Sequence, residues 1–155
     1  MINEFFNCFT GYWYVIMQPT IFVSQPIIDI LVKECCASYP YEACGFLIGN
    51  NGFLKTVFDS KRSKNQSNDL NRYSIDPFEF YKTEKSLDQS NLSIIGFYHS
   101  HPNGSPHPSR YDIKNAWLGY SYVIISVDAH QSIAIKSWLI DATTGTCDEE
   151  TICIV

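Results

Sequence analysis

The stretch Tyr98–Asp112 has the sequence YHSHPNGSPHPSRYD, and it decides how the rest of the chain is interpreted. It continues an apolar run, LSIIGFY, that is typical of a buried strand. Alternate side chains of a strand point to the same face, so His99 and His101 are expected to project side by side. Two imidazoles in that arrangement can reach one Zn²⁺ at about 2.0–2.1 Å each.

Asp112 is expected to complete this metal site. The intervening loop, residues 103–108, contains one Gly and two Pro, which favour a stiff turn that folds back, and a short helix is expected to begin at Ser109. The Asp112 carboxylate can then return to the two imidazoles. Two His and one carboxylate leave the fourth position of a tetrahedral site to water, which is typical of catalytic rather than structural zinc.

The same residues also have purely structural interpretations. Two histidines on a strand can simply be packed, and Ser109 with Asp112 matches a helix capping box, in which Ser109 is the N-cap. His107 and His130 are expected to be exposed loop residues rather than ligands. The joint spacing of two His, a turn and an Asp favours the metal site, and Ser109 can serve as a cap in either case.

Around this stretch the sequence predicts alternating strands and helices in an α/β fold with a central sheet. One domain is expected over residues 19–155, preceded by an extension of uncertain role over residues 1–18. The segment 60–72 is expected to be a polar surface loop, and the turn at Asn50-Asn51-Gly52 indicates a hairpin. Strands are expected at 21–24, 43–49, 53–58, 92–99, 122–127, 133–139 and 150–155, and helices between Ser24 and Pro40, over Pro77–Leu87 with Asp76 as its cap, and from Ser109.

Charge and the first residues exclude several classes of protein. The formal net charge of −5 opposes non-specific binding to nucleic acid or to an anionic membrane. Residues 1–18 carry no Lys or Arg, and Glu4 and Asn7 interrupt the apolar run, which argues against a secretory signal. No segment is long and apolar enough to predict a membrane span. Met17 is a candidate for an alternative start of the protein.

Cysteine spacing indicates a reducing compartment. The six cysteines include no C-x-x-C pair, and their spacing matches neither a thiolate zinc site nor a disulfide framework. Cys35 and Cys36 are adjacent and are expected to lie on a helix. Reduced and mostly buried thiols are the simplest interpretation, and they predict a cytoplasmic protein.

The segment from His99 to Asp112 matches the motif H-x-H-P-x(6)-S-x-x-D without a gap, and so resembles the JAMM (MPN-plus, JAB1/Mov34/PAD-1) metallopeptidases. Glu42, in YEACGFLIG, resembles the upstream glutamate of the compact, stand-alone bacterial members. The likeness covers residues from about 20 to 155. It implies a single-domain, cytidine-deaminase-like JAMM/MPN fold with a mixed, curved sheet flanked by helices.

By that resemblance, His99, His101 and Asp112 bind Zn²⁺, Glu42 is the general acid and base, and Ser109 donates to the oxyanion. The implied activity is hydrolysis of the peptide or isopeptide bond after the C-terminal Gly-Gly of a ubiquitin-like or sulfur-carrier protein. The short spacing between Glu42 and His99 is similar to that of sulfur-carrier-protein hydrolases, which release cysteine or another adduct.

Three alternatives remain at this stage. A RadC-type JAB-domain protein associated with DNA shares a similar motif, although the negative charge and the YEACGFLIG segment argue against it. A metal-free MPN interaction module lacks ligands, and none is missing in this sequence. A peptidase acting on cell-wall or phage-tail peptides is the third. Genomic neighbours, such as a small protein ending in Gly-Gly, would separate them.

Overall fold

The computed structural model describes residues 18–131 and 133–155. Apart from Gln18, the predicted extension over residues 1–18, including the alternative start at Met17, lies outside the described residues. The helices are α1 (Gln25–Ser38), α2 (Pro77–Leu87) and α3 (Arg110–Asn115), and the strands are β1 (Thr20–Val23), β2 (Cys44–Asn51), β3 (Lys55–Ser63), β4 (Ser93–Pro102), β5 (Ser121–Val127), β6 (Ile133–Asp141) and β7 (Thr146–Ile154).

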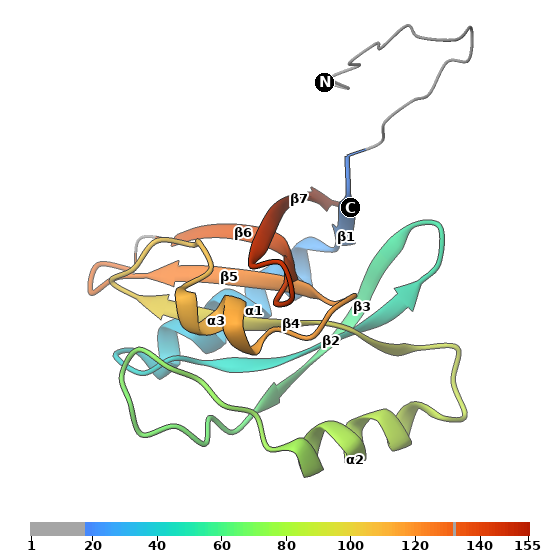
Figure 1. The fold of residues 1–155 in the computed structure, drawn as a ribbon, viewed down its shortest axis with the longest axis horizontal. Helices are drawn as coiled ribbons and strands as arrows, with labels where there is room; N and C mark the ends of the chain where they lie inside the picture. The colour runs from blue at the N-terminus through green and yellow to red at the C-terminus, as the bar shows by residue number, and fades with distance from the viewer. Residues whose placement is uncertain (1–17, 132) are drawn as a thin grey trace, which may run out of the picture.

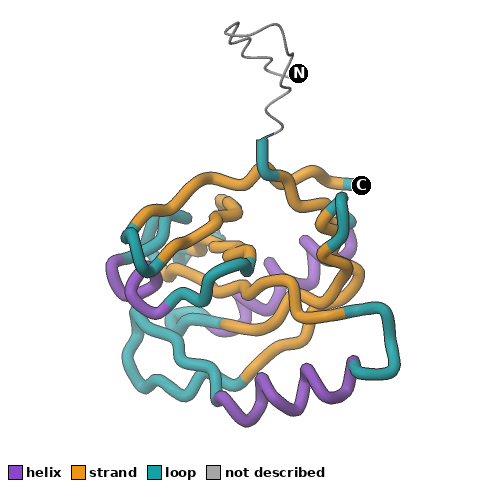
Figure 2. Tube along the Cα trace, turned by 45° about the vertical axis from the view of Figure 1, so that its right-hand side comes forward, coloured by secondary structure: helices purple, strands orange, loops and turns teal. Residues whose placement is uncertain are grey.

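The strands form one mixed sheet that curves until its edges meet, in the order β1-β3-β2-β4-β5-β6-β7 (Figure 2). β1 closes the ring because it pairs in parallel with both β3 and β7. β4 lies at the centre, antiparallel to β2 and parallel to β5. The predicted mixed, curved sheet with flanking helices is confirmed.

Helices cover both faces of the sheet. α1 packs on one face, and Figure 1 shows this helix behind the sheet. There Leu31 and Cys35 of α1 pack against buried, mostly aliphatic side chains of strands β1 to β5. On the other face, α2 and α3 pack on a second cluster that is rich in aromatic residues, including Phe46 and Phe97. The alternation of the two clusters along β2 and β4 is the expected consequence of strand geometry. Among the described residues, no helix has both the length and the apolar character needed to span a membrane.

Most predicted elements are confirmed, but three strands extend at least three residues beyond a predicted end. β3 continues to Ser63, so the prediction that the loop begins at residue 60 was wrong. β4 continues past His99 to Pro102, and β7 begins at Thr146 rather than at Glu150. The additional residues are mostly polar, and backbone pairing with a neighbouring strand holds them in the sheet.

The two caps predicted from sequence, Asp76 and Ser109, are both found, whereas the first helix has no side-chain cap. Asp76 caps α2, because its carboxylate accepts a hydrogen bond from the Phe78 N–H at 2.8 Å. Ser24 occupies the N-cap position of α1, but its hydroxyl forms no capping bond. Pro26 in the first turn has no N–H to satisfy, which lowers the need for a side-chain cap there.

Candidate metal centre and active site

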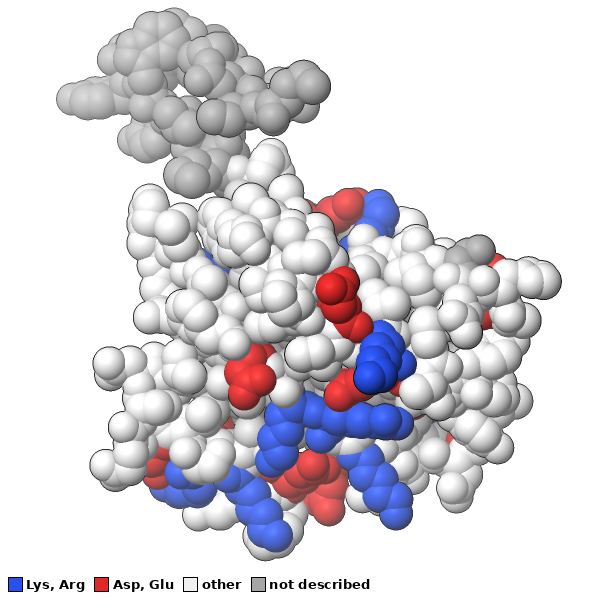
Figure 3. All heavy atoms as spheres, turned by 180° about the vertical axis from the view of Figure 1, so that it is seen from behind, with Lys and Arg blue, Asp and Glu red and all other residues white. Residues whose placement is uncertain are grey.

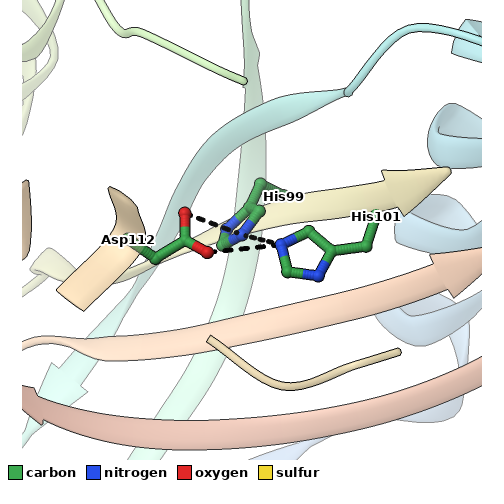
Figure 4. A group of neighbouring side chains, drawn as sticks. All are labelled: His99, His101 and Asp112. Carbon is green, nitrogen blue, oxygen red and sulfur yellow. Dashed lines mark hydrogen bonds and ion pairs between the residues drawn. The ribbon is translucent and has the colours of Figure 1, made fainter. Parts of the chain in front are cut away.

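His99 and His101 lie at the C-terminal end of β4 and project from the same face of the strand (Figure 4). β4 is paired on both sides at His99, with Cys44 of β2 and Ile124 of β5, so the backbone beneath the imidazoles is fixed. The His99 side chain is fully buried, and the His101 side chain is 12% exposed. The two Nε2 atoms face each other at 3.0 Å.

Asp112 reaches the same point from α3. Its Oδ1 lies 3.5 Å from His99 Nε2, and its Oδ2 lies 3.3 Å from His101 Nε2. The carboxylate is oriented by a complete capping box, in which the Ser109 N–H donates to Asp112 Oδ2 at 2.7 Å and the Asp112 N–H donates to Ser109 Oγ at 3.2 Å. The predicted capping box is therefore confirmed, and it holds the carboxylate against the histidines.

The three side chains form a group with the spacing of metal ligands. Their ligand atoms all lie within 4.8 Å of one another. Ligands at about 2.0–2.1 Å in a tetrahedral site are separated by roughly 3.3 Å, and the observed separations of 3.0, 3.3 and 3.5 Å lie around that value. A bound cation would also relieve the close approach of the two imidazole nitrogens. The residues present therefore fit a divalent metal.

A hydrogen bond to the backbone orients the His101 imidazole so that one nitrogen lone pair faces the candidate metal position. His101 Nδ1 lies 2.8 Å from the Ser105 carbonyl oxygen, so Nδ1 carries the proton and the Nε2 lone pair faces the site. His99 Nδ1 has no hydrogen-bond partner among the described residues, and the ring is held by packing instead. Tyr73 stacks on His99 with ring centroids 4.3 Å apart and planes at 25°.

The electrostatics keep His99 neutral and Asp112 ionised. Burial lowers the pKa of His99 below its ordinary value. Burial acts to raise the pKa of Asp112, but its interactions with His101 and His99 and the bond from the Ser109 N–H outweigh burial and hold that pKa well below the ordinary value. An anionic carboxylate beside a neutral imidazole is the protonation state that a metal ion requires of its ligands.

Glu42 lies beside this group, immediately before β2. The residue is only 6% exposed. Burial, with repulsion from Asp112, raises the pKa of Glu42 from 4.5 to about 7, although the nearby His101 acts in the opposite direction. A carboxyl group with a pKa near neutrality can both accept and return a proton, as a general base and acid must.

The other residues considered from sequence have ordinary positions. Ser109 is exposed, and its Oγ accepts the capping bond, while no bond donated by that hydroxyl is found among the described residues. His107 and His130 are both exposed, as expected. Cys44 is buried and pairs with His99, burial raises the pKa of its thiol to about 12, and its sulfur is not part of the ligand group.

Two concave regions meet the site. A cavity of about 210 Å³ reaches it at Asp112 and is lined largely by aromatic side chains, among them Tyr73, Phe97 and Trp117. A second hollow reaches it at Glu42, and its wall is basic and polar. The aromatic cavity is suited to an apolar segment of a substrate.

Three residues of the site were not identified from sequence. Tyr73 and Asn65 come from the polar segment that follows β3, and Ser100 lies between the two histidines. The Ala43 N–H donates to Ser100 Oγ at 2.8 Å, and this bond joins the backbone next to Glu42 to β4. Of these three residues, only Ser100 could have been identified from sequence, because it lies inside the motif. Nothing in the sequence marks Tyr73 or Asn65 as part of the site.

Residues 24–141 match the family of prokaryotic homologues of the JAB domain. This match covers well over half of the chain, so the protein belongs to that family. A desampylase from Haloferax volcanii is 32% identical over 94 residues, which cover 60% of this chain and 68% of the relative. A CysO-cysteine peptidase from Mycobacterium tuberculosis is 25% identical over 134 residues, which cover 86% of this chain and 90% of the relative.

Solved structures agree with this placement. A protein from Desulfitobacterium hafniense has 28% identity and a TM-score of 0.78, covering 88% of this chain and 93% of that one. A JAB1/MPN domain protein from Archaeoglobus fulgidus has 15% identity and a TM-score of 0.54, covering 84% and 96%, and shows the fold alone. The predicted α/β JAMM/MPN fold is confirmed, and the family and its peptidase relatives confirm the prediction of a JAMM-type peptidase.

Proposed function

We propose that this protein is a zinc-dependent hydrolase that cleaves the bond after the C-terminal Gly-Gly of a ubiquitin-like or sulfur-carrier protein. The observation that carries the proposal is the convergence of His99, His101 and Asp112 beside a buried Glu42. The names of the relatives support the class of substrate. The five described cysteines are all free, which supports a cytoplasmic location.

His99, His101 and Asp112 would hold the metal, leaving one position open. A zinc ion held there would supply a water of lowered pKa and would polarise the carbonyl that is attacked. Glu42 accepts a proton from the attacking water and delivers it to the amide nitrogen as the carbon–nitrogen bond breaks. The products are the Gly-Gly carboxylate and the free amine of the leaving group.

Ser109 is suited to stabilising the carbonyl oxygen as negative charge develops. Its Oγ accepts the bond from the helix backbone, and the hydroxyl hydrogen remains to be donated. The residue is exposed between the loop and α3, where its backbone position is fixed by the capping box. The cap and the oxyanion donor are therefore compatible roles of one side chain.

Carrier cleavage is the direct test of this function. The ubiquitin-like proteins ending in Gly-Gly that are encoded in the source genome, each extended by one alanine, are incubated with the enzyme, and release of alanine is followed by mass spectrometry. We expect at least one carrier to be cleaved after Gly-Gly, with loss of cleavage after treatment with 1,10-phenanthroline and its return on addition of Zn²⁺. Cleavage that is unaffected by the chelator, or no cleavage of any carrier, would contradict the proposal.

A further inference from the structure

The loop between β4 and α3 crosses two neighbouring strands before it returns to the candidate metal site. The Asn103 N–H donates to the carbonyl of the last residue of β5 at 2.8 Å, and the Trp138 indole N–H of β6 donates to the Pro106 carbonyl at 2.8 Å. The loop therefore runs from the end of β4 over β5 to β6 and then turns back to α3. Its path determines how His101, which precedes it, and Asp112, which follows it, face each other.

Three consecutive carbonyl groups of this loop, those of residues 104–106, each accept a hydrogen bond from a side chain of a different strand. The donors are, in that order, Ser126 Oγ of β5, His101 Nδ1 of β4 and Trp138 Nε1 of β6. The middle bond orients the His101 imidazole toward the candidate metal position. Because the carbonyls before and after it are both held, the Ser105 carbonyl is kept directed at His101.

Ser126 and Trp138 lie on the face of the sheet that carries the candidate metal site. Ser126 pairs with His101 in the register of β4 and β5. Trp138 belongs to the buried aromatic cluster on which α2 and α3 pack, and it is only 6% exposed. Its backbone is paired with β5 on one side and with β7 on the other. Both donors are therefore positioned by the sheet rather than by the loop that they hold.

Neutral hydrogen bonds hold this loop. Figure 3 shows the molecule from behind, on the side of α1, with Lys and Arg side chains gathered on the lower part of that face. The loop lies on the other side of the sheet, with Trp138, and no ion pair within residues 18–131 and 133–155 involves residues 102–108. A single hydrogen bond to the loop can therefore be removed by substitution without changing a charge.

We propose that Trp138 and Ser126 are positioning residues of the candidate metal site, which hold the loop so that the Ser105 carbonyl keeps the His101 imidazole directed at the metal. The proposal rests on the function given above, because it concerns the metal that His101 would bind. Loss of a group that orients a ligand typically lowers metal affinity by about 10–100-fold. Trp138 and Ser126 act on His101 through the loop, so the expected loss for each is about tenfold, the low end of that range.

The test compares metal binding in variants that each lack one of these hydrogen bonds. Trp138→Phe keeps an aromatic ring but cannot donate, and Ser126→Ala removes the hydroxyl. Competition with a chelating dye measures Zn²⁺ affinity, and the visible absorption spectrum of the Co²⁺-loaded protein reports the geometry of the ligands. Each variant should bind Zn²⁺ about tenfold more weakly and alter the Co²⁺ spectrum. Ser126→Thr retains a hydroxyl and should keep the wild-type affinity and spectrum.

Ser137→Ala is the matched control, because Ser137 precedes Trp138 on β6 and points to the opposite face. Its hydroxyl is buried and donates to Glu150 at 2.7 Å. The substitution should lower the free energy of unfolding, as loss of a buried hydrogen bond does, and leave the Zn²⁺ affinity and the Co²⁺ spectrum unchanged.

Two results would overturn the positioning role. The first is wild-type affinity and spectrum in both Trp138→Phe and Ser126→Ala. The second is an equal loss of affinity in Ser137→Ala, since the effect would then follow from stability alone. A wild-type protein that bound neither metal would overturn the proposed function itself, and the positioning role with it.

Discussion

The Asn65 side chain donates a hydrogen bond of 3.1 Å to the backbone carbonyl of Glu42. The same Nδ2 also donates to the Arg72 carbonyl at 3.0 Å, next to the tyrosine that stacks on His99. The Asn65 side chain therefore connects two parts of the site. It holds the backbone of Glu42, the candidate general base, and the loop that carries Tyr73 over His99. A side chain in that position controls the placement of Glu42 without touching the substrate's reacting atoms.

Replacing Asn65 should lower turnover more than substrate binding. Asn65→Ala removes the bond to Glu42, and we expect kcat to fall by roughly 10–100-fold, the range for losing the support of an active-site group, with KM changed little and metal retained. Asn65→Asp keeps an acceptor for the loop N–H groups but cannot donate to Glu42, so it should also be impaired. Asn50→Ala is the matched control, because Asn50 lies near the end of β2 and its side chain accepts from the Gly52 N–H, away from Glu42. Wild-type kcat in Asn65→Asp would show that the Glu42 bond has no role.

Glu42 should make the stability of the metal-free protein depend on pH. Folding raises the pKa of Glu42 from 4.5 to about 7, so the folded state holds a proton over a range in which the unfolded state has lost it. The contribution of Glu42 is therefore most favourable below pH 4.5 and is lost as the pH rises toward 7. Glu42→Gln cannot titrate at this position. The free energy of unfolding of Glu42→Gln, relative to that of wild type, should therefore rise by roughly 1–3 kcal/mol between pH 4 and pH 8. Denaturant unfolding at both pH values measures this; an unchanged difference would contradict the burial of Glu42 as an ionisable group.

The two roles of Ser109 can be separated by substitution. Ser109→Ala removes the capping acceptor and should cost roughly 0.5–2 kcal/mol of stability. Ser109→Asp keeps an acceptor for the Asp112 N–H but cannot donate while ionised, so this variant should fold and bind metal with turnover reduced by about 10²–10³-fold. Thermal unfolding, metal content and turnover are measured for both. A stable, metal-loaded Ser109→Asp enzyme with wild-type turnover would assign Ser109 to the cap alone.

The stacking of Tyr73 on His99 should matter for the metal site through packing rather than through its hydroxyl. Tyr73→Phe preserves the ring and should retain the metal affinity of wild type, whereas Tyr73→Ala would expose His99, a fully buried candidate ligand, and should weaken that affinity. We expect a loss on the order of tenfold, at the low end for removing a residue that supports a ligand. Competition with a chelating dye measures the metal affinities. Equal affinities in Tyr73→Phe and Tyr73→Ala would show that the Tyr73 ring does not support metal binding.

The motif predicted that His99, His101 and Asp112 come together, because the geometry that joins them is local. His99 and His101 share a face of one strand, and the capping box between Ser109 and Asp112 fixes the carboxylate at the start of α3, so spacing alone constrains three of the side chains. Glu42 required a resemblance to known proteins, since its place beside His101 depends on the pairing of β2 with β4. Asn65 and Tyr73 could not be found, because the segment that carries them has no periodicity and is positioned by hydrogen bonds across the fold. For the same reason the extension of β3 to Ser63 was not predicted.

Metal content tests the central claim most directly. The purified wild-type protein, His99→Ala, Asp112→Ala and the control His107→Ala are reconstituted with Zn²⁺, desalted and analysed by elemental mass spectrometry, with folding checked by circular dichroism. Three converging ligands predict about one Zn²⁺ per chain in wild type and in His107→Ala, and loss of most zinc in the two ligand variants, because each lacks one of the three protein ligands. Full zinc in folded His99→Ala and Asp112→Ala would contradict the assignment of this site.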